Sequence, residues 1–198
     1  KREVVRVITP GVVFDLRSLE GTQNNFLASL ARCSETGEVG VGWIDVSTGE
    51  RRGAQVDTLR MAFDELGRVE PSEIVVCEED RALAKLVSEA LPGVLLSPLA
   101  QPDKPIRGGL EGAMLLLDGY LERTRLDRRL PLRPLEAQDL HTHVRLGNAT
   151  IRNLELLRTL SEGKRRGSLL GLVDLTRTAM GGRRLKQWLL YPLLDPEA

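Results

Sequence analysis

The order of extended and helical segments between residues 25 and 99 constrains the fold of this chain more than any other feature. Two apolar, β-prone runs, 25–32 and 39–46, are separated by CSETGE, whose glycine and polar residues suit a hairpin loop. The following STGERRGAQV turns at Gly49 and predicts a short third strand. A meander of three antiparallel strands is therefore expected.

Two helix–strand units follow the meander. TLRMAFDELGRV has near-helical apolar spacing, with Thr58 as the predicted N-cap and Gly67 followed by Pro71 as the predicted stop. The buried-looking strand PSEIVVCE comes next. DRALAKLVSEAL predicts a helix that begins at Asp80, and VLLSPL a fifth strand. This order is that of a ribonuclease H-like α/β sandwich, although the periodicity alone would support other three-layer folds.

The stretch 98–109 contains three prolines and two glycines, so it predicts a loop. LEGAMLLLDGYLERT then resumes a helix with one apolar stripe, which we expect to cover the sheet. LDRRLPLRPLEAQDL reads as a proline-marked connector without regular structure. We therefore expect a domain boundary at about residue 135.

The sequence after this boundary is expected to be mainly helical. Ser168 and Thr178 are good N-caps for helices in SLLGLVDL and TAMGGRRLKQWLL. Gly181 and Gly182 cost the second helix roughly 1 kcal/mol each relative to alanine, so we expect a close helix contact there. The apolar residues crowded around Trp188 and Leu189 predict that both are buried, either against the connector or against a second copy of the chain.

Charge and hydropathy exclude several function classes. The net charge is zero and no apolar run reaches the roughly 18 residues that span a bilayer, so neither a dedicated nucleic-acid module nor a membrane protein is indicated. Between Arg145 and Lys186, however, the sequence has ten basic residues and only three acidic ones. Lys164, Arg165 and Arg166 lie there in a glycine-flanked loop and are candidate phosphate contacts or simply a solvated surface.

Asp45 raises the question of metal-dependent nuclease chemistry. Such catalysis holds two metal ions with three or four carboxylates, the first of them on the first strand. The run 25–32 contains no acid, and Glu65 and Glu78 are single residues at expected surface positions. We predict that Asp45 is structural and accepts hydrogen bonds within the turn that follows it.

The remaining histidines and cysteines do not predict a site. His141 and His143 lack a third ligand nearby and are expected to be exposed or packed. Cys33 and Cys77 show no metal-ligand spacing and lie in apolar runs, which predicts packed, reduced thiols and a cytoplasmic protein. No metal or cofactor site is expected in these residues.

Five stretches of this sequence resemble the bacterial MutS mismatch-repair family, in the family's order and over nearly the whole chain. They are VVRVITPG (4–11), NNFLA (24–28), DVSTGE (45–50), RNLEL (152–156) and GSLLGLVDLTRTAMGGRRLKQWLLYPLLDPEA (167–198). The last stretch is highly specific.

The resemblance implies three parts: 1–19, a linker from the mismatch-recognition domain; 20–135, a ribonuclease H-like connector domain; and 136–198, the N-terminal part of a helical core domain. It implies a non-catalytic segment of a longer, homodimeric, ATP-driven clamp that scans DNA for mispairs. ATP and Mg²⁺ would bind elsewhere in that protein, and a MutL-type partner would use the outer face of the connector.

The sequence departs from the family in ways that limit what can be transferred. By the resemblance, the family's Phe-x-Glu mismatch wedge lies before residue 1 and its phosphate loop after residue 198, and no GxxxxGK[ST] occurs in these residues. The stretch 98–109 is shorter than in most relatives, and Gly147 and Asn148 stand where Asp and Ala are common. Two alternatives stay open. A ribonuclease H-like nuclease would show metal-dependent cleavage that Asp45→Asn abolishes, and a basic nucleic-acid-binding module would bind DNA in a salt-sensitive manner.

Overall fold

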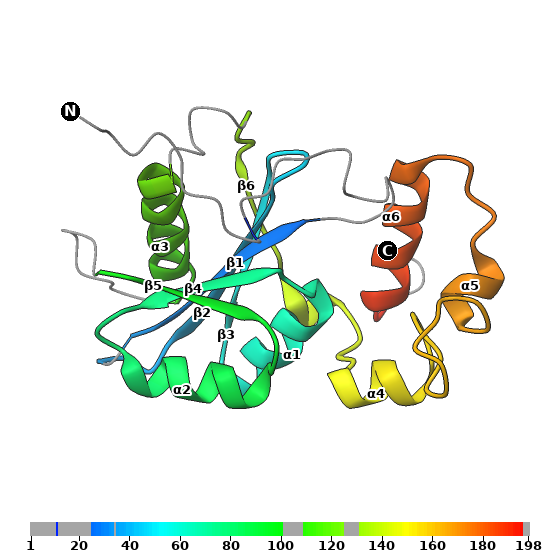
Figure 1. Ribbon diagram of the computed structural model, residues 1–198, viewed down its shortest axis with the longest axis horizontal. Helices are drawn as coiled ribbons and strands as arrows, with labels where there is room; N and C mark the ends of the chain where they lie inside the picture. The colour runs from blue at the N-terminus through cyan, green and yellow to red at the C-terminus, as the bar shows by residue number, and fades with distance from the viewer. Residues whose placement is uncertain (1–10, 12–24, 34, 101–108, 125–130, 196–198) are drawn as a thin grey trace. The chain divides into compact units, whose positions relative to one another are not determined.

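The computed structural model describes residues 11, 25–33, 35–100, 109–124 and 131–195 (Figure 1). The chain divides into two compact units, which change over between Gln138 and Asp139. Unit 1 comprises the described residues up to Gln138, and unit 2 those from Asp139 onward. Except for Gly11, the expected linker 1–19 lies outside the described residues.

Unit 1 is built on one mixed β-sheet, which confirms an α/β fold. In the described residues its strands follow the order β5-β4-β1-β2-β3-β6. The β1–β2 and β2–β3 pairs are antiparallel, as the predicted meander requires, whereas β1–β4, β4–β5 and β3–β6 are parallel. The strands are β1 (Phe26–Arg32), β2 (Val39–Asp45), β3 (Glu50–Val56), β4 (Glu73–Cys77), β5 (Leu95–Leu99) and β6 (Leu135–Ala137).

Three helices of unit 1 lie where the sequence predicts them: α1 (Leu59–Val69), α2 (Arg81–Ala90) and α3 (Gly109–Thr124). The predicted N-caps are confirmed, because the side chains of Thr58 and Asp80 accept hydrogen bonds from backbone N–H groups of the first turn. Helix α1 ends between Gly67 and Pro71, the two residues predicted to stop it. Helix α1 continues to Val69 and is capped by Glu70 at φ 52°, and burial of Arg68 and Val69 offsets the propensity cost of the glycine.

The helices cover both faces of the sheet, with α3 on one face and α1 and α2 on the other (Figure 1). Leu27 and Ala31 of β1 point to the same face, where they join a buried cluster with Leu116 and Leu117 of α3. On that face the Ser29 hydroxyl donates a 2.6 Å hydrogen bond to the Ala113 carbonyl. The prediction that this helix covers the sheet is confirmed.

Strand β6 is a feature that the sequence did not predict, since its residues fall in the expected irregular connector. Its three residues are all exposed and pair in parallel with Arg51, Arg52 and Gly53 of β3. A strand this short, with no buried face, lacks the alternation of apolar and polar residues from which strands are predicted. The partner strand also lies about 80 residues earlier in the chain.

The regular structure in the described part of unit 2 is helical, apart from one isolated β-bridge between His143 and Leu193. It contains the 3₁₀ helix η2 (Leu140–Thr142) and the helices α4 (Asn148–Asn153), α5 (Leu169–Val173) and α6 (Ala179–Leu190). A small core gathers Ile151, Leu156 and Leu190. The predicted caps are confirmed: the Ser168 hydroxyl accepts from the Gly171 N–H at 3.1 Å, and the Thr178 hydroxyl from the Gly181 N–H at 3.1 Å.

Helix α4 begins at the position where the sequence departs from the family. Gly147 is its N-cap, and no side chain caps the first turn. An Asp at this position could supply the missing acceptor, so the departure removes a local stabilising contact rather than the helix itself.

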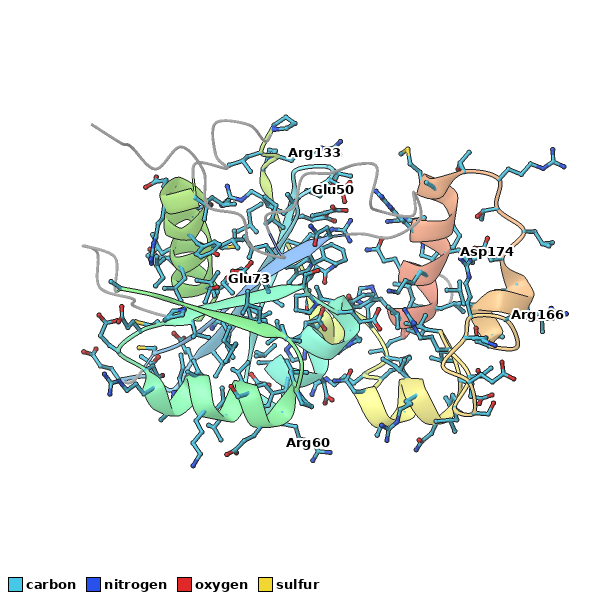
Figure 2. The ribbon with its side chains drawn as sticks, viewed as in Figure 1. Glu50, Arg60, Glu73, Arg133, Arg166 and Asp174 are labelled. Carbon is cyan, nitrogen blue, oxygen red and sulfur yellow. The ribbon has the colours of Figure 1, made fainter. Side chains whose placement is uncertain are left out.

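The predicted close helix contact at Gly181 and Gly182 of α6 is wrong. An added Cβ at Gly181 or Gly182 would lie 3.1–3.5 Å from side-chain atoms of Thr176, Thr178 and Asp174, so the tight space comes from the preceding turn and not from another helix. Figure 2 labels Asp174 in this turn.

Trp188 is not buried within unit 2, and its burial against the connector stays a prediction. The Trp188 side chain is 61% exposed, with the Arg184 guanidinium 5.6 Å from its ring centroid. The buried side of α6 runs instead through Gly182 and Leu190. Association of Trp188 with a second copy stays a prediction.

None of the described helices is long and apolar enough to cross a membrane.

Candidate functional site

Asp45 at the end of β2 is structural, as predicted. One carboxylate oxygen, Oδ1, accepts hydrogen bonds from the Ser47 N–H at 2.8 Å and the Ser47 hydroxyl at 2.6 Å. The Asp45 carbonyl accepts from the N–H groups of Thr48 and Gly49 at 3.1 and 2.8 Å. The side chain is therefore engaged by its own turn, and within the described residues Asp45 belongs to no group of three side chains that could hold a metal ion.

Glu65 was expected at the surface, and this prediction is wrong. It is fully buried on α1 and forms a 3.0 Å ion pair with Arg68, which is also buried. The stripe of α1 that faces the sheet includes position 65 together with Ala62, Leu66 and Val69. The spacing of apolar residues alone did not predict the full buried stripe, because Glu65, which is paired with Arg68, occupies part of it. Glu78 is exposed, as expected.

Glu73 is the functional candidate that sequence reasoning missed. This first residue of β4 is fully buried, and its two carboxylate oxygens accept hydrogen bonds from three separate segments. Oε2 accepts from the Gly11 N–H at 3.0 Å. Oε1 accepts from the Tyr120 hydroxyl of α3 at 2.5 Å and from the Ser97 hydroxyl of β5. Figure 2 labels Glu73 within unit 1, and we call these four residues the Glu73 clamp.

The Glu73 clamp leaves no space for a side chain at Gly11. A Cβ there would lie 2.7 Å from Glu73 Oε2, 2.8 Å from Glu73 Cβ and 3.0 Å from Leu27 Cδ1. A buried carboxylate is tolerated only when its hydrogen bonds are satisfied, and here the donors come from β5, α3 and the segment that precedes the sheet. The only sequence feature that could have indicated Glu73 as a candidate is that this acid begins the otherwise apolar strand EIVVC.

The predicted phosphate contacts in unit 2 are partly engaged within the protein. Lys164 forms a 2.8 Å ion pair with Glu162, and Arg165 forms an ion pair with Asp174. Arg166 is exposed, and Figure 2 shows it at the surface of unit 2. Phosphate binding by this loop stays a prediction, with Arg166 the side chain most available for it.

The two histidines lie close together without forming a metal site within the described residues. The Arg145 guanidinium donates to His141 Nδ1 at 2.8 Å. His143 Nδ1 is 2.9 Å from the Thr142 hydroxyl, and its ring meets the Tyr191 ring edge-on, with centroids 6.0 Å apart. His141 is exposed and His143 is half-buried and packed, as expected.

The two cysteines are free thiols that pack in unit 1. Cys33 is buried. Hydrogen bonds lower the pKa of its thiol, first the one with the Thr36 side chain and then those with the backbone of Thr36 and Glu35. Cys77 is half-buried, and burial followed by its hydrogen bond to Glu79 raises its pKa. Their expected packing role is confirmed.

Comparison with known proteins agrees with the division into two units. A MutS domain II family model matches residues 25–95, within unit 1. A MutS domain III family model matches residues 149–198, within unit 2. Both models describe parts of the same protein, and they follow each other in the chain.

Full-length relatives match across the whole chain. A "DNA mismatch repair protein MutS" of Desulfosudis oleivorans is 32% identical over 225 residues, covering 100% of this chain and 25% of the relative. Proteins with the same name from Exiguobacterium sp. and Bacillus subtilis are 37% and 33% identical, each covering 98% of this chain and 23% of the relative. The chain thus spans about a quarter of the length of these relatives. It belongs to the MutS family, whose domains II and III it matches.

Proposed function

We propose that this segment couples mismatch recognition to the ATPase state of a MutS-type DNA mismatch-repair protein, without catalysis of its own. Unit 1 would be the connector and would have a ribonuclease H-like fold. This assignment is supported by the antiparallel β1–β2–β3 meander followed by parallel β4 and β5.

The Glu73 clamp carries the proposal. Gly11 lies in the stretch that, by resemblance, leaves the mismatch-recognition domain. The same buried carboxylate that accepts the Gly11 N–H also accepts hydroxyl groups from β5 and α3. A displacement of Gly11 must therefore either break a buried hydrogen bond or move the sheet and α3 with it, which is the mechanical requirement for a rigid coupling block.

The remaining activities are proposed for the whole protein. It would act as a homodimer on mismatched DNA and would bind ATP and Mg²⁺ outside residues 1–198, since these contain no GxxxxGK[ST] sequence. A MutL-type protein would bind the outer face of the connector. The names of the relatives, each a DNA mismatch repair protein, support a role in mismatch repair.

Gly11→Ala in a full-length protein containing this segment tests the proposal. The added Cβ would displace Gly11 from the buried Glu73 side chain without altering residues of the sheet. We expect the affinity for mismatched DNA to change less than about twofold. The effect of mismatched DNA on the rate of ATP hydrolysis should fall by about tenfold, which lies in the usual range of coupling between two sites. Equilibrium binding and steady-state ATP hydrolysis measure the two quantities.

Gly37→Ala is the matched control, because Gly37 lies in the β1–β2 loop with open space around it. Its positive φ of 74° imposes only a local cost, so coupling should be retained. Retention of normal coupling by Gly11→Ala would refute the proposal.

A further inference from the structure

Residues 131–138 form the last part of unit 1 before the chain continues into unit 2, and we call them the strap. The strap contains β6 and lies along β3 at one edge of the sheet (Figure 1). Its backbone is held at both ends, since the Arg133 N–H donates to the Gly49 carbonyl at 3.0 Å and the Gln138 N–H to the Gly53 carbonyl at 2.8 Å.

Two ion pairs join the strap to β3. The Arg133 guanidinium lies 3.3 Å from a Glu50 carboxylate oxygen, and Arg52 Nε lies 3.4 Å from Glu136 Oε2. Figure 2 shows Arg133 and Glu50 near each other. The strap side chains of both pairs are well exposed, so both pairs are open to screening by salt.

Apolar burial contributes little to this attachment. All three residues of β6 are exposed, Leu135 at 40% and Leu132 in the preceding stretch at 36%. The central strand β1 differs, because its five middle residues are buried. Segments with few buried apolar contacts and exposed hydrogen bonds open at low free energy without unfolding of the rest.

We propose that the strap is a releasable edge strand, whose ionic contacts with β3 set how much free chain lies between unit 1 and unit 2. When it is attached, unit 2 follows directly after Gln138. When it is released, eight residues become tether, which adds an extended reach of about 26 Å. This device goes beyond coupling through the Glu73 clamp, since it would vary the separation of the two units while the sheet stays folded.

Arg133→Gln combined with Glu136→Gln tests the strap. The double variant removes both ion pairs to β3, preserves the net charge and leaves every residue of β3 unchanged. We expect the backbone amides of Arg133 and of 135–138 to exchange with solvent about 2- to 30-fold faster than in the wild type, the range for two exposed ion pairs. Amides of β1 and β2 should keep their protection. Hydrogen exchange followed residue by residue by NMR measures this in the 198-residue chain.

Lys85→Gln combined with Glu89→Gln is the matched control, because it removes an exposed ion pair of α2. It should leave exchange in the strap unchanged. In the wild type, 1 M salt should accelerate strap exchange, and the double strap variant should lose most of this dependence. The proposal is overturned if wild-type strap amides are as protected as those of β2, if they have no protection, or if the two double variants behave alike.

Discussion

A chain that carries Gly40→Ala should have a much less stable unit 1. Gly40 of β2 faces the first turn of α3, and an added Cβ would lie 1.9 Å from both the carbonyl carbon and the oxygen of Gly109, and 2.3 Å from Leu110 N. These are backbone atoms that no side-chain rotation can clear. The helix must shift off the strand, so we expect a loss of about 3–5 kcal/mol, a large part of the stability of a domain.

Denaturant unfolding followed by the fluorescence of Trp43 measures this loss. Trp43 is buried in β2, whereas Trp188 is exposed, so Trp188→Phe in both proteins isolates the signal of unit 1. Gly37→Ala is the control for adding a methyl group in the neighbouring loop, at a cost of about 1–2 kcal/mol for its left-handed backbone. A Gly40→Ala chain within 1 kcal/mol of the wild type would contradict the close contact.

Glu73→Ala should destabilise unit 1 by about 3 kcal/mol or more. The substitution leaves three donors without their acceptor, namely the Gly11 N–H and the hydroxyls of Ser97 and Tyr120. Each unsatisfied buried group costs about 1–3 kcal/mol, and the lost side chain also leaves a cavity. The same fluorescence-monitored unfolding gives the free energy of unfolding.

Glu122→Ala is the control for removing a glutamate, because Glu122 is exposed on α3. It should change stability by less than about 0.5 kcal/mol. Tyr120→Phe should fall between the two, at about 1 kcal/mol, since it removes one hydroxyl donor and keeps the ring. Equal stability of Glu73→Ala and Glu122→Ala would exclude the clamp as a stabilising contact.

Local signals in the sequence predicted most of the regular structure. Thr58, Asp80, Ser168 and Thr178 each place a side-chain oxygen just before an apolar-periodic run, and all four cap helices. Asp45 was likewise predictable, because its partners lie within four residues of it.

Features that depend on distant residues were not predictable in this way. Glu73 accepts hydrogen bonds from Gly11 and Tyr120, which are 62 and 47 residues away in the chain. The local sequence EIVVC does not indicate these partners. Strand β6 depends on β3 in the same manner. Apolar character alone also did not show which residue of α6 enters the core of unit 2, because Leu190 does so and Trp188 does not.

The amide of Gly11 gives the most direct test of the account. We claim that Glu73 fastens the segment preceding the sheet to the core of unit 1. Hydrogen exchange of the ¹⁵N-labelled chain should therefore find the Gly11 amide protected. Glu73→Gln preserves the size of the side chain but removes its charge, so protection of Gly11 should fall by about tenfold while amides of β1 and β4 stay protected. A Gly11 amide that exchanges as in an unfolded chain, or one whose protection is unchanged by Glu73→Gln, would contradict the claim.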